Sequence, residues 1–146
     1  MKVADFMKDR TRQIITTKAD TKVRDAMALL IDSKISCLPV VSDRNELQGI
    51  ISDKDIFRAA FENPTDFTKS EVRDLMSTDL IVGLADDDFD YIAGLMTKNR
   101  IRHVPIVENK LLVGLLSLGD IVKSQLKSIE IENRYLKMYI EDAYPG

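Results

Sequence analysis

Two segments of the chain each place a serine and an aspartate where they could hold a polar ligand. The segments read GIISDKDI from Gly49 to Ile56 and GLLSLGDI from Gly114 to Ile121. In both, two residues separate the serine from the aspartate (Ser-x-x-Asp), and the pair lies where an apolar strand is followed by a helix. Free backbone N–H groups at a helix start, together with a hydroxyl and a carboxylate, can bind phosphate and sugar hydroxyls. The pattern is therefore suited to a nucleoside phosphate.

The same pairs, Ser52 with Asp55 and Ser117 with Asp120, also fit a capping box. In a capping box each side chain bonds a backbone N–H group of its own helix and needs no ligand. A single match favours capping, whereas two matches in register, each after an apolar strand and a glycine, shift the balance toward a binding site. Both interpretations stay open at this point.

A second group of candidates lies just before a proline-containing strand in each half of the chain. Arg102 and His103 put a permanent cation and a titratable imidazole at the start of one strand. Ser36 and Cys37 occupy the matching positions in the other half, and Cys37 is most simply a small buried side chain. No nucleophile, base and orienting group come together around the single histidine, so we expect no catalytic site and no enzyme.

We also expect no metal site. Asp86, Asp87, Asp88 and Asp90 form an acidic run, which a favourable helix N-terminus explains better than a bound metal. One cysteine and one histidine are too few for an ordinary zinc site.

These candidates belong to an internal repeat that covers most of the chain. Pro39, Gly49, Ser52 and Asp55 are matched in register by Pro105, Gly114, Ser117 and Asp120, and VADFM near the N-terminus is matched by VRDLM. Each copy reads as strand, helix, strand, strand, helix, from apolar residues at helical or strand spacing. The predicted first strands are QIITT and LIVGL, and the later ones are CLPVV, LQGIIS, HVPIV and LLVGLLS.

The repeat predicts a mixed α+β fold of two βαββα units related by a pseudo-twofold axis, with paired clefts where they meet. We expect repeat 1 over residues 1–62, a linker over 63–70, repeat 2 over 71–124 and a helical tail over 125–146. The tail carries an apolar stripe of Leu126, Ile129, Leu136 and Ile140. This stripe either packs on its own domain or pairs with a helix of a second subunit.

Composition excludes several classes of protein. The chain has 146 residues, a net charge of −3 and scattered Lys and Arg, so the basic stripe of a duplex-binding protein is absent and nucleic acid is not an expected partner. No stretch is long and apolar enough to span a bilayer or act as a signal peptide. A single cysteine suits a reducing compartment. We therefore expect a cytoplasmic protein that does not contact a membrane.

The doubled proline-containing strands, each followed by a Gly-h-h-Ser-x-x-Asp-h segment in which h is apolar, resemble a tandem pair of cystathionine-β-synthase (CBS) domains, also called a Bateman module. The resemblance covers residues 1 to about 124, and the tail is similar to that of small free-standing bacterial members. It implies a disc-like regulatory module that binds AMP, ADP, ATP or S-adenosylmethionine and is not usually an enzyme.

The resemblance also implies two crossed clefts, each built from both repeats. One cleft would use Ile50, Ser52, Asp55, Leu80, Ile81, Arg102, His103 and Val104. The other would use Ile14, Ile15, Ser36, Cys37, Leu38, Leu115, Ser117 and Asp120. Because charge-assisted hydrogen bonds to phosphate are strong, Arg102 and His103 favour the Asp55 cleft for a phosphate.

The expected partners are an adenosine-derived small molecule, with or without Mg²⁺, a second copy of the chain in a homodimer, and a regulated protein that the sequence does not identify. No cofactor is required. The alternative is a structural dimerisation module in which the Ser and Asp residues only cap helices.

Overall fold

The computed structural model describes residues 1–8 and 13–128, and its elements follow the internal repeat. The first repeat contains α2 (Val23–Ser33), β1 (Cys37–Val41), β2 (Leu47–Ser52) and α3 (Asp53–Glu62). The second contains β3 (Gly83–Leu84), α5 (Phe89–Asn99), β4 (His103–Glu108), β5 (Leu111–Ser117) and α6 (Leu118–Ser128). Three short helices complete the fold: α1 (Val3–Lys8), the 3₁₀ helix η1 (Phe67–Lys69) and α4 (Val72–Leu75). Ile129, Leu136 and Ile140 of the predicted tail stripe lie outside the described residues.

The strands form two small sheets, which confirms the predicted mixed α+β fold. In the first, β1 pairs with β2 antiparallel. In the second the strand order is β3-β4-β5, with β3 parallel and β5 antiparallel to β4. No helix in the described part of the chain is long and apolar enough to cross a membrane.

The predicted first strand of each repeat is shorter in the structure. QIITT contributes only a bridge between Thr17 and Val40, in which the Thr17 N–H donates to the Pro39 oxygen and the Val41 N–H donates to the Thr17 oxygen, both at 3.0 Å. LIVGL contributes only β3. To extend this parallel pairing toward the N-terminus, the partner strand would have to donate the backbone N–H of residue 39 in the first repeat and of residue 105 in the second. Both residues are proline, which has no N–H. The prolines that mark the repeat therefore also stop this pairing.

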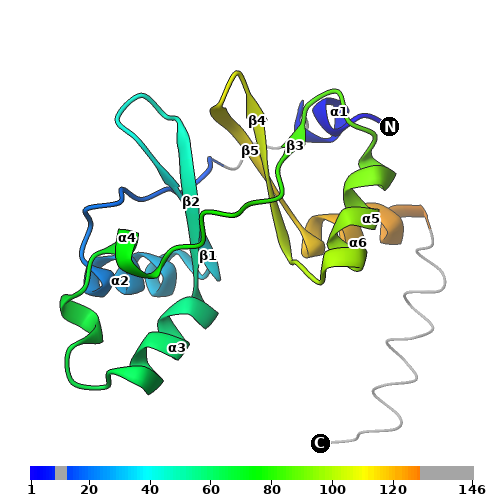
Figure 1. Cartoon of the computed structure of the whole chain (residues 1–146). Coiled ribbons are helices and arrows are strands. Elements are labelled where there is room, and N and C mark those ends of the chain that lie inside the picture. Colours follow the sequence, from blue (N-terminus) through cyan, green and yellow to red (C-terminus); the bar gives the residue numbers. More distant parts are fainter. Residues whose placement is uncertain (9–12, 129–146) are drawn as a thin grey trace, which may run out of the picture.

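Each repeat is completed by the leading helix of the other repeat. Figure 1 shows α1 beside α5 in one half of the molecule and α4 beside α2 in the other. Val3 is fully buried in the core of the second repeat, and the Phe6 and Phe89 rings lie 5.0 Å apart there. Val72 is fully buried in the core of the first repeat. The two halves of the sequence therefore exchange their first helices.

Backbone hydrogen bonds fix this exchange in the same way at both ends. The Val3 N–H donates to the Asp87 oxygen at 2.9 Å, and the Val72 N–H donates to the Thr21 oxygen at 2.8 Å. A further pair of bonds joins Ile50 of β2 to Ser77, just after α4, at 3.0 and 2.8 Å. The segment that follows α4 is thereby brought to the edge of β2, the strand that ends in Ser52.

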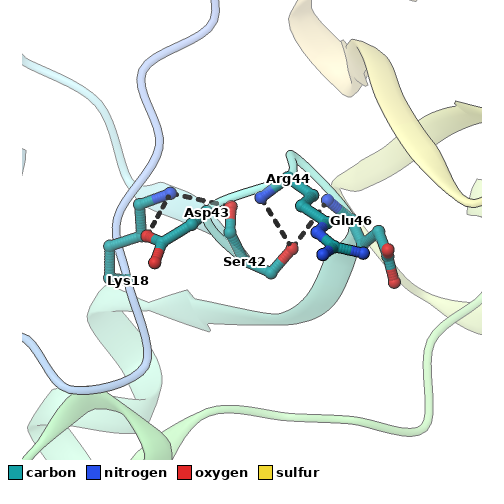
Figure 2. A network of polar contacts seen from close by, with 5 residues as sticks. All are labelled: Lys18, Ser42, Asp43, Arg44 and Glu46. Carbon is teal, nitrogen blue, oxygen red and sulfur yellow. Dashed lines mark hydrogen bonds and ion pairs between the residues drawn. The ribbon is translucent and has the colours of Figure 1, made fainter.

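The turn between β1 and β2 is held by a small polar network. Figure 2 shows the Ser42 hydroxyl oxygen accepting bonds from the backbone N–H groups of Arg44, at 3.2 Å, and Glu46, at 3.1 Å. The Lys18 ammonium donates to the Ser42 carbonyl oxygen at 2.7 Å and pairs with Asp43 at 3.6 Å. The predicted turn at residues 42–45 is thus anchored to the segment that precedes α2.

This turn also joins the two sheets. Asn45, whose φ is 64°, donates through Nδ2 to the Leu112 oxygen at 2.9 Å. The Leu47 N–H donates to the Lys110 oxygen, and the Leu112 N–H donates to the Asn45 oxygen, both at 3.1 Å. Contacts between the hairpins and the exchanged helices hold the two repeats in a fixed relation, so the clefts between them have defined walls.

Candidate functional site

The Ser-Asp pairs form the capping contacts that their spacing permits. One Asp55 oxygen, Oδ2, accepts bonds from the Ser52 N–H at 2.8 Å and from the Ser52 hydroxyl at 3.0 Å. The Asp55 N–H donates to the Ser52 Oγ at 3.3 Å, which completes the box at the start of α3. Ser117 and Asp120 repeat the arrangement on α6, with bonds of 2.8 and 3.1 Å. Capping is therefore one function of both pairs.

Both motifs also open onto clefts. The cleft beside Asp55 has a volume of about 320 Å³ and the cleft beside Asp120 about 630 Å³. The Asp55 cleft is lined by Ser36, Cys37, Ile50, Ser52, Asp53, Lys54, Asp55, Ser77, Asp79, Leu80, Ile81, Arg100, Ile101, Arg102 and His103. The Asp120 cleft is lined by Met7, Gln13, Ile14, Ile15, Lys34, Ile35, Ser36, Cys37, His103, Val113, Gly114, Leu115, Ser117 and Asp120. Each cleft draws residues from both repeats.

The structure brings together most of the residues that the resemblance assigned to each cleft, with one exception per cleft. Val104 and Leu38 line neither cleft and are fully buried in the two cores. The reason is the alternation of side chains along a strand, because each follows a residue, His103 or Cys37, that faces the cleft. The side chains of Leu38 and Val104 therefore point into the cores, while their neighbours Cys37 and His103 line the clefts.

Three basic residues of the clefts were not among the predicted ones: Lys54, beside Asp55, and the helix-ending residues Lys34 and Arg100. Lys34 lines the Asp120 cleft and Arg100 lines the Asp55 cleft. Both end a helix, α2 or α5, in the left-handed conformation, with φ of 56° and 53°. The repeat carried a signal for them, because each stands at the matching position before the paired candidates Ser36-Cys37 and Arg102-His103.

The two clefts share one wall. Ser36, Cys37 and His103 line both of them. Cys37 begins β1 and is in register with Ser52, while His103 begins β4 and is in register with Ser117. The starts of β1 and β4 therefore border both clefts.

The titratable side chains of this wall are held in their neutral forms. Burial lowers the pKa of His103 below its usual 6.5; Arg102 lowers it further, and Asp120 and Asp53 act in the opposite direction. Burial also raises the pKa of Cys37 to about 12, with smaller contributions from Asp53 and Asp55. The imidazole and the thiol are therefore both uncharged at neutral pH.

Fixed charges are distributed unequally among the described lining residues. The Asp55 cleft contains Lys54, Arg100 and Arg102 together with three aspartates, whereas the Asp120 cleft contains Lys34 and Asp120. The described residues contain no group of three or more His, Cys, Asp or Glu that could hold a metal ion. The Asp55 cleft thus offers a phosphate more cationic donors than the described part of the Asp120 cleft does.

Comparison with known proteins finds the same repeat elsewhere. The family described as CBS domain matches this chain twice, over residues 3–62 and 72–127. A relative from Bacillus subtilis, the CBS domain-containing protein YhcV, is 29% identical over 118 residues, which cover 81% of this chain and 83% of that protein.

Two similar solved structures contain adenosine derivatives. The crystal structure of CBSX2 in complex with AMP has a TM-score of 0.76 and 29% identity, and the match covers 86% of this chain and 96% of that chain. The CBS domain pair of protein MJ0100, in complex with 5′-methylthioadenosine and S-adenosyl-L-methionine, has a TM-score of 0.75 and 26% identity, over 88% of this chain and 98% of that chain.

Proposed function

The chain belongs to the CBS domain family, and from this membership we propose that it is a regulatory module without catalytic activity that binds an adenosine-containing ligand in its clefts. CBS domain pairs are typically regulatory parts of larger systems. The observation that carries the proposal is the pair of clefts, each with a Ser-Asp motif from one repeat and strand residues from the other. Proteins similar to this chain bind AMP, 5′-methylthioadenosine and S-adenosyl-L-methionine.

The residues of each cleft suit the parts of such a ligand. Asp55 or Asp120 would accept hydrogen bonds from the ribose hydroxyls, because a carboxylate can accept several bonds. Leu80 and Ile81 in one cleft, and Ile14 and Ile15 in the other, would lie against the adenine ring. Arg100 and Arg102 favour the Asp55 cleft for AMP, ADP or ATP, with Mg²⁺ as an optional companion of the longer phosphate chains.

The proposed output is a change in the geometry of a homodimer or in the position of the C-terminal segment. Apolar side chains are exposed on the helices of both repeats, with Phe57 and Phe61 of α3 at 78% and 85% exposure and Val122 of α6 at 46%. A second copy of the chain would cover these faces. Ligand binding can alter the dimer only if two arrangements differ in ligand affinity.

Thermal unfolding with and without ligand tests the proposal. AMP, ADP, ATP and S-adenosylmethionine would be added to nucleotide-free protein, with and without Mg²⁺. A ligand at 100 times its dissociation constant adds about 2.7 kcal/mol to the stability of the folded state, which raises the melting temperature by several degrees. Absence of a shift with every ligand would overturn the proposal.

Asp74 offers a matched control for this experiment. Its carboxylate accepts a bond from the Glu71 N–H at 2.9 Å in a capping box of α4, and it lines neither cleft. Asp55→Ala, Asp120→Ala and Asp74→Ala each remove a capping carboxylate. Only the first two should also reduce the ligand-induced shift.

The alternative is a module that only dimerises and binds no ligand. The completed capping contacts of Ser52 with Asp55 and of Ser117 with Asp120 favour it, because they give both pairs a structural role. This alternative predicts that all three Asp→Ala variants lose similar stability and that no adenosine compound shifts the melting temperature of the wild type.

A further inference from the structure

The wall shared by the two clefts has a consequence for ligands that carry phosphate. It consists of Ser36, Cys37 and His103, each of which lines both clefts. Two ligand groups that touch opposite sides of one side chain are separated by little more than its width. That separation is comparable with the Debye length of about 8 Å at physiological ionic strength, so solvent ions screen their charges only in part.

Three of the four basic residues that line the described parts of the clefts are close to this wall in the chain and would draw phosphate toward it. Lys34 lies just before Ser36 and Cys37 in the chain and lines the Asp120 cleft. Arg100 and Arg102 lie just before His103 and line the Asp55 cleft. A phosphate paired with these side chains in either cleft would therefore lie close to the wall rather than at the far end of its cleft.

The wall itself supplies no positive charge to separate two such groups. The pKa of His103 is lowered by burial and by Arg102, and the pKa of Cys37 is raised to about 12, so both side chains are neutral at pH 7. Ser36 has no charge. The described basic and acidic residues that line each cleft are equal in number, so a bound phosphate monoester, which carries about −1.5 to −2 at this pH, leaves each cleft with a net negative charge.

We propose that phosphate-bearing ligands in the two clefts antagonise each other across this wall. Filling one cleft then lowers the affinity of the other for a second phosphate-bearing ligand, but not for an uncharged nucleoside. The inference rests on the proposed function, because it requires that both clefts accept adenosine compounds. Its consequence is that mixed occupancy, with one phosphorylated and one unphosphorylated ligand, is favoured over double occupancy by nucleotide.

Isothermal titration with AMP and with adenosine tests this inference. Asp55→Ala, or Asp55→Asn if the first variant folds poorly, disables one cleft and gives the affinity of the Asp120 cleft beside an empty neighbour. In the wild type, with the Asp55 cleft filled, we expect AMP to bind the Asp120 cleft at least about fivefold more weakly, the lower end of ordinary coupling between sites. The affinity of the Asp120 cleft for adenosine should differ by less than about twofold between the wild type and the Asp55 variant.

Two further arms test the electrostatic origin of the effect. Raising KCl to about 0.5 M shortens the Debye length and should narrow the fivefold difference for AMP. His103→Lys places a permanent cation in the wall and should narrow it as well.

Each result decides between the two proposals. Equal and independent binding of AMP in both clefts, or the same antagonism with adenosine, would overturn the inference and leave the proposed function in place. No binding of AMP, adenosine or the other adenosine compounds to either cleft would overturn both.

Discussion

Gly49→Ala should destabilise the protein because the two residues that follow the exchanged helix α4 leave no room for a methyl group. A Cβ atom at Gly49 would lie 2.8 Å from the Ser77 carbonyl oxygen and 2.9 Å from the Met76 Sδ. The methionine can move, but the Ser77 oxygen belongs to the backbone and accepts the 3.0 Å bond from the Ile50 N–H. Inserting a carbon into such a packed site costs about 1–3 kcal/mol.

Gly94→Ala is the matched control. Gly94 lies inside α5, and a Cβ atom there would have no neighbour within 4 Å. Alanine is favoured over glycine inside a helix by about 0.5–1 kcal/mol. A similar preference applies to Gly49 inside β2, so the free energies of unfolding of the two variants should differ by about 1–3 kcal/mol in equilibrium urea denaturation. If the two variants were within about 0.5 kcal/mol of each other, the packing of Met76 and Ser77 against β2 would be refuted.

Three other predictions concern the motif and the wall. Ser117→Ala removes the 3.1 Å bond from the Asp120 N–H and should cost about 0.5–2 kcal/mol in urea denaturation, whereas an unchanged stability would contradict the cap. Cys37 is 3% exposed and its pKa is about 12, so the native thiol should react with a disulfide reagent at pH 8 about a hundredfold more slowly than the urea-unfolded thiol. Burial and the charge of Arg102 lower the pKa of His103 below 6.5 in the folded state, against the opposing charges of Asp120 and Asp53, so the unfolded state binds more protons and stability should fall as the pH drops through 6.5. His103→Gln should flatten this decrease, and a decrease of the same size in the variant would contradict the assigned cause.

The repeat in the sequence predicted most of the fold. Matching proline, glycine, serine and aspartate positions gave the two units and their strands, since strands and helices leave periodic apolar patterns in the chain. The exchange of α1 and α4 was not predictable in this way. VADFM and VRDLM match each other equally well whichever core they enter, and only the backbone bonds of Val3 and Val72 to the opposite repeat distinguish the two arrangements.

The site was predicted less completely than the fold. The motif positions and the starts of β1 and β4 carried a clear signal, because they recur and are chemically distinctive. Lys34 and Arg100 were not among the predicted site residues, although they occupy matching positions of the repeat, because only the structure shows that these left-handed helix ends line the clefts. Leu38 and Val104 were assigned to the clefts although strand alternation turns them into the cores.

The most direct test of the central claim is a crystal structure of this protein grown with AMP. The account predicts the nucleotide in the Asp55 cleft, with its ribose on the Asp55 carboxylate and its phosphate beside Arg100 or Arg102. It also predicts the adenine against Leu80 and Ile81. An AMP-soaked crystal with both clefts empty at saturating nucleotide, or with AMP bound away from both Ser-Asp motifs, would contradict the account.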